Sequence, residues 1–266
     1  MTNPKIHQEG VAHEELYHKK ANNQAGKCTA STDKIEQVAR EDLKKCSDAA
    51  TRFLSRFNVV KLLGECGAYK EKGVPVMVIM LYIFNLMFSP MSMYYQIRMG
   101  GFHEGFSKNT VYRFLDNAHM NWQTFLLRLS YTVIRFLVGL TEDKDNRYAL
   151  IVDDSPLAKR GKAMELVSKY FNHVTMGYEY GYRILTLAWT DGCTTVPILY
   201  SLLAASCDEK VRGKIRNDID GRSQAGRIRK LARTSMNDLT AKFACTAVKA
   251  GIPASIITFD SWSRPA

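Results

Sequence analysis

The sequence predicts an α/β fold in which a helical N-terminal region is followed by a mixed β-sheet with flanking helices. Residues 31–140 carry apolar side chains at helical spacing. From Tyr148 onward the pattern changes to short, continuous apolar runs that end in acids or turn residues, as buried strands do. A long amphipathic stretch, residues 223–250, then precedes the last of these runs.

The length and composition are those of a globular protein with a basic surface. The 266 residues are enough for one large domain, or for a core domain with a smaller helical one. Apolar residues make up 46% and charged residues 24%, which excludes collagen, fibrous coiled coil and wholesale disorder. The net charge of +11 favours a polyanionic partner, because basic side chains that neutralise phosphates release counterions.

The cysteines and the longest apolar run bear on localisation. The six cysteines form no C-x-x-C pair, so we expect reduced thiols in a cytoplasmic chain. The first thirty residues are polar and contain no secretory signal. The run Val74–Phe88 contains Asn85 and is shorter than the roughly 20 apolar residues of a spanning helix. We therefore expect a buried core helix there, and no membrane partner.

The N-terminal half is predicted to contain a disordered polar tail over 1–30 and a helical, candidate DNA-binding region over 31–140. Within it, residues 106–117 predict a short helix with Ser107 as N-cap and with Val111, Phe114 and Leu115 facing inward. Another helix is expected over 121–140. The pair could form a helix-turn-helix-like reader of DNA ends, whose outward polar residues would be Lys108, Asn109 and Arg113. A polar linker, 141–147, follows.

Residues 148–266 are predicted to form strands and one long helix. Tyr148–Asp154 is an apolar run expected to be buried on both faces. Residues 183–192 and 194–203 flank an Asp-Gly turn and predict an antiparallel hairpin, in which Pro197 indicates an edge or a bulge. A helix is expected over 223–250, with Ile228 on its apolar face, and a further strand over 255–260.

Two of these strands end in acids. The order strand, strand, strand, helix, strand is the opening topology of a ribonuclease H-like fold, in which the first and fourth strands lie side by side. That arrangement would bring Asp153 and Asp260 together, and two close carboxylates suit Mg²⁺ or Mn²⁺. The alternative is that both acids are turn residues that merely end their strands.

At these residues the sequence resembles a known family, the DDE transposases of bacterial insertion sequences, in the branch with a D-D-[ST] first motif and an F-D-S-W second motif. The likeness extends over about residues 100–266, and the stretch 106–126 is similar to the helical region that precedes the catalytic core in that branch. The phrases that carry the likeness are IVDDSPLAKRGK, LTLAWTDGCTTVPI, DGRSQAGRIRKLA and ITFDSWSRP.

The resemblance implies a metal-dependent nuclease and strand transferase that acts on double-stranded DNA, at element ends and target. It also implies a two-metal site for Mg²⁺ or Mn²⁺ in the complete enzyme, a possible homo-oligomer and no small-molecule substrate. The first acid maps to the doublet Asp153-Asp154 and the second to Asp260. We favour Asp153, because a D-x-[ST] reading fits it with Ser155, but Asp154 remains a rival. Strand alternation lets only one of the doublet face a metal.

Basic residues near these motifs are candidates for DNA contact. After the first acid come Lys159, Arg160 and Lys162, which could hold a phosphate near the site or belong to a solvated loop. Further basic residues lie on or just before the long helix, and they could either contact the DNA backbone or simply be charged surface residues. They are Arg222, Arg227, Arg229 and Lys230.

The family pattern also needs a third carboxylate, a Glu on a helix beyond the second acid, and this sequence has none there. We therefore expect a partial, C-terminally truncated catalytic domain over 148–266 that cleaves DNA weakly or not at all. One alternative is a non-catalytic DNA-binding fragment that occupies element ends or inhibits a full-length transposase. Another is a structural helical protein that binds RNA through charge alone.

Overall fold

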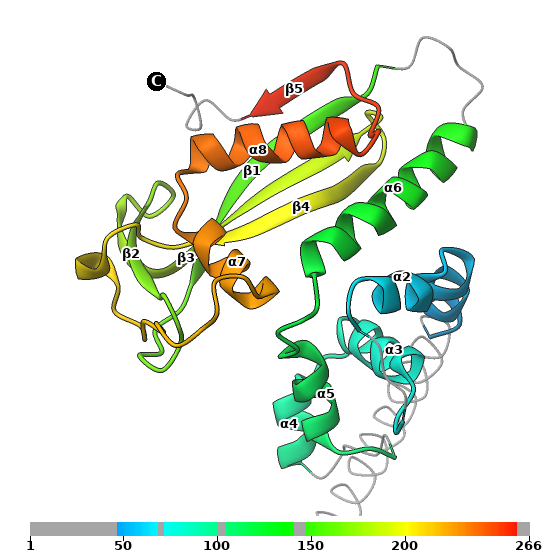
Figure 1. Ribbon diagram of the computed structural model, residues 1–266, viewed down its shortest axis with the longest axis horizontal. Helices are drawn as coiled ribbons and strands as arrows, with labels where there is room; N and C mark the ends of the chain where they lie inside the picture. The colour runs from blue at the N-terminus through cyan, green and yellow to red at the C-terminus, as the bar shows by residue number, and fades with distance from the viewer. Residues whose placement is uncertain (1–46, 69–71, 100–104, 141–146, 260–266) are drawn as a thin grey trace, which may run out of the picture. The chain divides into compact units, whose positions relative to one another are not determined.

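The computed structural model describes residues 47–68, 72–99, 105–140 and 147–259 (Figure 1). The tail over 1–30, most of the linker and Asp260 lie outside the described residues. The chain divides into two compact units. The first comprises Met1–Phe53 with Met80–Glu104, and the second comprises Leu54–Ile79 with Gly105–Ala266.

The first unit is helical throughout its regular structure. It contains residues 47–53, the part of α3 (Val76–Leu86) from residue 80 onward, and α4 (Met93–Arg98). Phe53 and Phe84 stack with ring centroids 6.2 Å apart, and the Asn85 amide donates to the Ser47 hydroxyl over 3.2 Å. The apolar run at 74–88 forms a helix, as predicted, but not a fully buried one, because only Ile79 and Tyr82 of α3 are buried and Val78 is exposed, as are Met87 and Phe88 beyond it. In the described parts of the chain, no helix has the length and apolar character needed to cross a bilayer.

The second unit begins with three helices, α2 (Val59–Glu65), α5 (Lys108–Leu115) and α6 (Trp122–Leu140). Ser107 is the N-cap residue of α5, as predicted, and Val111 and Phe114 are buried. Leu115 is 47% exposed, so its predicted inward orientation is wrong. It is the last residue of the helix, where the chain turns away and no further turn covers it. Within α6 the most deeply buried residues include Ser130 and Ile134.

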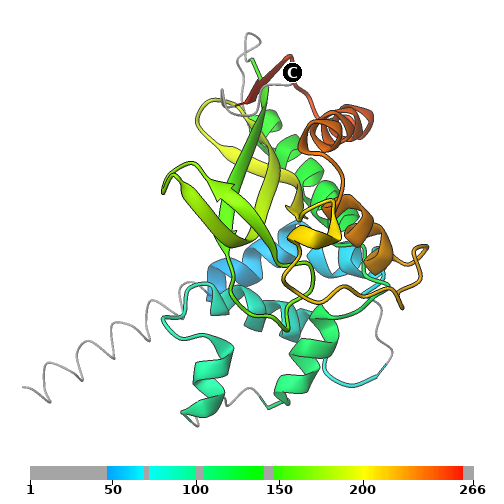
Figure 2. The same cartoon turned by 90° about the vertical axis from the view of Figure 1, so that its left-hand side faces the viewer.

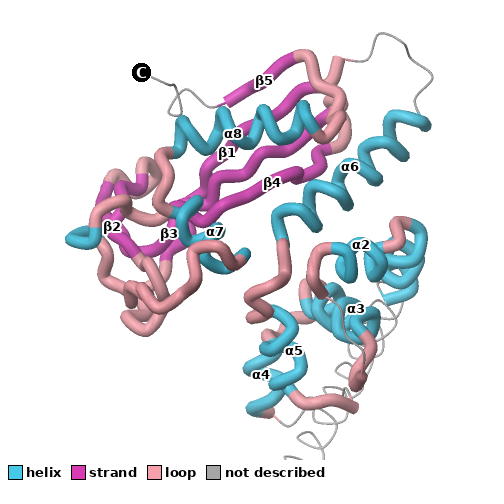
Figure 3. Tube along the Cα trace, in the orientation of Figure 1, coloured by secondary structure: helices cyan, strands magenta, loops and turns pink. Residues whose placement is uncertain are grey.

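A five-stranded mixed sheet forms the centre of the second unit (Figure 3). Its strands are β1 (Ala149–Ala158), β2 (Ser168–Asn172), β3 (Gly177–Thr190), β4 (Thr195–Leu203) and β5 (Ile256–Phe259). The order is β2-β3-β1-β5, and β4 also pairs with β3. Only the β1–β5 pair is parallel among these ladders. The predicted mixed α/β architecture is confirmed and is consistent with a ribonuclease H-like core.

The β3–β4 hairpin forms where the Asp-Gly signal predicted it. The Asp191 carboxylate accepts hydrogen bonds from the backbone N–H groups of Cys193 and Thr194, at 2.9 and 2.6 Å. Gly192 has a φ of 94°, in the left-handed region that favours glycine. Pro197 pairs with Ala188 at an irregularity in the β3–β4 register. A residue without a backbone N–H is tolerated at such a bulge, as predicted.

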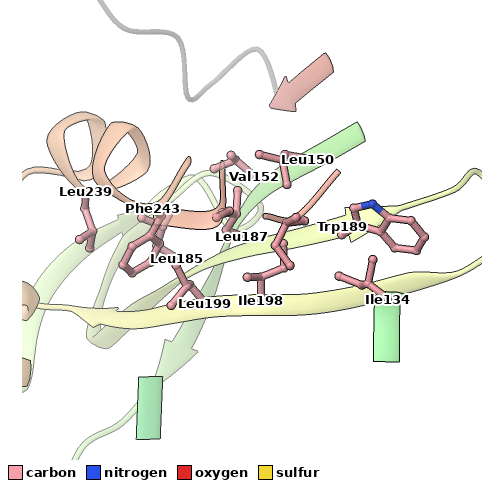
Figure 4. Close-up of a cluster of buried hydrophobic side chains, with 12 residues drawn as sticks. Ile134, Leu150, Val152, Leu185, Leu187, Trp189, Ile198, Leu199, Leu239 and Phe243 are labelled. Atoms are coloured by element: carbon pink, nitrogen blue, oxygen red, sulfur yellow. The ribbon is translucent and has the colours of Figure 1, made fainter. Parts of the chain in front are cut away.

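The core lies on one face of the sheet, under α6 and α8 (Met236–Lys249). Figure 4 shows its side chains, with Leu187 and Trp189 of β3 among them. In β1 only alternate residues, Leu150 and Val152, are fully buried, so the prediction of burial on both faces is wrong. The other members of the buried cluster are Ile134, Leu185, Ile198, Leu199, Leu239, Phe243, Ala247 and Ile252.

The long helix predicted over 223–250 is two helices, α7 (Gln224–Ala232) and α8. The Ser235 hydroxyl accepts a hydrogen bond from the Asp238 backbone N–H over 3.2 Å and starts the second helix. A Ser with an acid three residues later can accept hydrogen bonds from unpaired backbone N–H groups at the start of a helix. This pattern favours the start of a new helix over the continuation of α7. Ile228 is exposed rather than part of an apolar face that continues into α8.

Candidate active site

Asp153 lies within β1 (Ala149–Ala158), where the strand leaves the buried core. The strand continues four residues beyond Asp154, so the prediction that it ends at the acidic doublet is wrong. Val152 before it is buried, whereas Asp153 is exposed and points to the opposite side of the strand, as alternation requires. The Ser155 hydroxyl donates a hydrogen bond to Asp153 Oδ2 over 3.0 Å. A Ser two positions along the strand is on the same face and within reach, so the D-x-S spacing itself orients this carboxylate.

Asp154 is on the core side of the same strand and is held by a cation. Arg183 of β3 donates from Nε to Asp154 Oδ2 over 2.6 Å, and its Nη2 contacts the same oxygen. The Asp154 side chain is 15% exposed in this pair. Charge-assisted hydrogen bonds of this kind fix a carboxylate strongly. The two acids of the doublet therefore have different environments, one open and one neutralised.

The second predicted acid follows β5. Residues Ile256–Phe259 pair in parallel with Ala149–Val152, and Phe259 is the register partner of Val152 (Figure 1). Asp260 is the next residue in the sequence and lies outside the described residues. The described register thus ends at the positions immediately before Asp153 and Asp260.

A pocket of about 260 Å³ adjoins this end of β1. Both acids of the doublet line it together with Arg183. The rest of its wall comes from the hairpin of β2 and β3, which the sequence analysis did not predict, and from Pro156. These hairpin residues are Tyr170, Phe171, Asn172, His173 and Val174.

Titratable groups on the hairpin have shifted pKa values. Burial, reinforced by a hydrogen bond to the Glu179 carboxylate, raises the pKa of Tyr170. Hydrogen bonds from Asn172, Thr175 and Tyr170 lower the pKa of Glu179. The Glu179 carboxylate therefore accepts hydrogen bonds within the hairpin in its ionised form.

The exposed carboxylate of Asp153 is compatible with an oxygen-liganded cation. Asp153 is an exposed carboxylate with a single short hydroxyl contact, and hard cations such as Mg²⁺ take carboxylate ligands. Across residues 47–68, 72–99, 105–140 and 147–259, no three His, Cys, Asp or Glu side chains gather as a metal site would require. Of the predicted metal ligands, the structure describes Asp153 alone.

The basic residues after β1 and on α5 are positioned at the surface. Arg160 and Lys162 are exposed in the loop that follows β1, and Lys159 is half-buried. The backbone N–H of Lys159 donates to the carbonyl of Tyr180 over 2.8 Å, which ties the loop to the hairpin. On α5, the three residues predicted to face outward are exposed, namely Lys108, Asn109 and Arg113.

The basic residues around α7 differ in their availability. Arg229 forms a two-pronged ion pair with Glu165, with Nε–Oε1 and Nη2–Oε2 distances of 2.6 and 2.7 Å. Arg222 is exposed and pairs with Asp220 over 3.3 Å. Arg227 and Lys230 are exposed, and both line a second pocket.

This second pocket has a volume of about 400 Å³ and lies among α6, α7, α8 and β4. Its cations are Arg227, Lys230 and Lys242, and among the described residues no acid lines it. The sequence analysis did not single out Lys242, because its place beside Arg227 and Lys230 depends on how α7 and α8 pack. Arg183 was missed as a functional residue because it opened a predicted strand, although its spacing from Leu185 and Leu187 places it on their face.

Comparison with protein families matches residues 90–263 to a family described as DDE superfamily endonuclease. No significant match was found among curated proteins or solved structures. The matched region includes α5, α6, the whole sheet and both candidate strand ends. Membership indicates a nuclease-type function on DNA, in a family that generally uses divalent metals. Because the match covers well over half of the sequence, this chain belongs to the DDE superfamily endonucleases.

Proposed function

We propose that this chain is a transposase of the insertion-sequence type, which cuts double-stranded DNA at element ends and joins the freed ends to a target. The proposal places Mg²⁺ or Mn²⁺ between Asp153 and Asp260. The observation that carries it is the parallel β1–β5 register, which reaches Val152 and Phe259. In-register residues of parallel neighbours share a face. If this register continues by one residue on each strand, the partner of Asp260 is Asp153 rather than Asp154.

In this proposal each acid of the doublet has one role. Asp153 holds the cation, and Ser155 orients its carboxylate through the 3.0 Å hydrogen bond. Arg183 keeps Asp154 on the core side, where it holds this part of β1 against β3 without competing for the metal. When bound, a divalent cation activates water as a nucleophile and stabilises the leaving oxygen of a phosphodiester.

We also propose that the surface cations hold DNA. Arg160 and Lys162 would bind a phosphate beside the cleavage site, and Lys159 would anchor their loop. Arg227, Lys230 and Lys242, around the acid-free pocket, would contact the backbone further away. Lys108, Asn109 and Arg113 would read an element end. Arg229 would act structurally, through Glu165.

The resemblance implies a third carboxylate ligand, and no three His, Cys, Asp or Glu side chains gather among the described residues, so we expect cleavage by this chain to be slow or absent. Glu165 is bound to Arg229, and Glu179 accepts hydrogen bonds from Tyr170 and Thr175. Neither is available as the missing ligand. Metal binding is therefore a better test of the site than cleavage.

The experiment titrates Mn²⁺ into the wild type and the variants Asp153→Asn, Asp260→Asn and Asp48→Asn by calorimetry, and assays Mn²⁺-dependent nicking of duplex DNA in parallel. Asp48 is exposed on the first unit and serves as the matched control. We expect both site variants to lose Mn²⁺ binding and any nicking, and the control to keep them. DNA binding without any Mn²⁺ binding by the wild type would overturn the proposal in favour of a non-catalytic DNA-binding fragment.

A further inference from the structure

The β2–β3 hairpin carries aromatic side chains on an exposed face. Tyr178 is 69% and Tyr180 is 36% exposed. In the antiparallel register Phe171 pairs with Tyr178, and Lys169 pairs with Tyr180. Cross-strand partners and alternate residues share a face, so these four side chains form one surface, here called the aromatic strip. Figure 2 shows the hairpin from the side.

Two cations lie over tyrosine rings of the aromatic strip: Lys169, which belongs to it, and Arg212, which lies beside it. Lys169 Nζ lies 4.6 Å from the ring centroid of Tyr178, and Arg212 Cζ lies 4.8 Å from that of Tyr180. Phe171 packs edge-on against Tyr178, with centroids 5.3 Å apart and an interplanar angle of 76°. Glu179 belongs to the other face of the hairpin, where it accepts a hydrogen bond from Tyr170. The strip therefore joins open aromatic surface to positive charge.

We propose that the aromatic strip binds unpaired bases of a DNA strand, with Tyr178 stacking on a base and with Lys169 and Arg212 near phosphates. Flat aromatic rings combined with basic side chains are the pattern by which proteins hold single strands, because a base exposes its π-face only when unpaired. Stacking accepts any base, because every base has a π-face, so sequence preference should be weak.

The location ties this surface to the candidate active site. Phe171 of the strip lines the same pocket as Asp153, together with His173 and Val174 from the hairpin turn. The inference rests on the proposed function in one respect: the bound strand would be the one released or distorted at the cleavage site. The binding itself requires no metal and can be measured apart from cleavage.

The experiment measures fluorescence anisotropy of labelled oligothymidylate and of a duplex of the same length, both in EDTA. The variants are Tyr178→Ala, Tyr178→Phe and Tyr94→Ala, since Tyr94 on α4 is a comparably exposed tyrosine, at 65%. We expect Tyr178→Ala to weaken oligothymidylate binding about tenfold or more and duplex binding little. Tyr178→Phe keeps the stacking ring and should bind like the wild type, as should Tyr94→Ala.

A second readout guards against a general loss of structure. An oligonucleotide carrying 2-aminopurine loses fluorescence when its base stacks on an aromatic ring, so quenching by the wild type but not by Tyr178→Ala supports the proposal. Unchanged oligothymidylate affinity in Tyr178→Ala would overturn it, as would equal losses for single strand and duplex. Failure of the metal site is distinguishable: Asp153→Asn should lose Mn²⁺ binding while it retains oligothymidylate binding in EDTA.

Discussion

Asp154 and Arg183 form an ion pair across β1 and β3, with Arg183 Nε 2.6 Å from Asp154 Oδ2. The adjacent Asp153 is exposed on the opposite face, with the Ser155 hydroxyl as its partner. The two adjacent acids of β1 therefore differ in role: Asp154 stabilises the fold, and Asp153 is open to a ligand.

This separation predicts effects of different size on stability for two matched variants. Asp154→Asn removes the charge that neutralises a half-buried Arg183, and should lower the free energy of unfolding by about 1–2 kcal/mol. Asp153→Asn alters an exposed group, and should change that free energy by less than about 0.5 kcal/mol. Urea denaturation measures both. A larger loss of stability in Asp153→Asn than in Asp154→Asn would contradict the assignment.

A second prediction concerns the arginines of α7. Arg227→Gln should weaken duplex binding and reduce the slope of log affinity against log salt by about 0.9, because one phosphate contact is lost. Arg229→Gln should leave that slope unchanged, since Arg229 is committed to Glu165, and should instead destabilise the fold. Binding titrations at several salt concentrations decide between them. An equal reduction in slope for both variants would show that the ion pair opens to DNA.

A third prediction concerns pH and the β3–β4 turn. Backbone hydrogen bonds from Thr194 and Cys193 lower the pKa of Asp191 below its ordinary value of 3.8. A carboxyl with a depressed folded-state pKa stabilises the protein fully above its unfolded pKa, and this contribution is lost as pH falls through the folded value. Between pH 5 and 2, stability should therefore fall more steeply in the wild type than in Asp191→Asn. Parallel curves from denaturation at stepped pH would refute this role.

A fourth prediction concerns thiol reactivity. Burial raises the pKa of the Cys66 thiol, so the reactive thiolate is scarce at neutral pH, although the charge of Arg128 partly offsets this. Cys193 and Cys207 are exposed. Mass spectrometry after brief iodoacetamide treatment should find these two alkylated well before Cys66. Early modification of Cys66 would mean that its surroundings open readily.

The elements with strong local signals were predictable from sequence. The Asp191-Gly192 turn, a strand at the apolar run before Asp153 and the helix after Ser107 all formed, although β1 is buried on one face only and Leu115 is exposed. The β2 strand was not predicted because five residues with a polar start give too little alternation, and its partner at 177–181 begins and ends in glycine.

The break between α7 and α8 was hidden in the sequence because the apolar residues on both sides of Ser235 keep one helical spacing. These residues are Ile228, Leu231, Leu239, Phe243 and Ala247. The Asp154–Arg183 pair depends on β1 and β3 being neighbours, which is a tertiary fact. The sequence therefore located the acidic doublet on the first strand, but it determined neither where that strand ends nor which member of the doublet is open.

The most direct test of the proposed metal site is the anomalous difference map of a crystal grown with Mn²⁺. The account predicts a peak within about 2.5 Å of carboxylate oxygens from both Asp153 and Asp260, with the Asp154–Arg183 pair intact. A peak coordinated by Asp154 in place of Asp153, or an Asp260 carboxylate directed away from the end of β1, would contradict it.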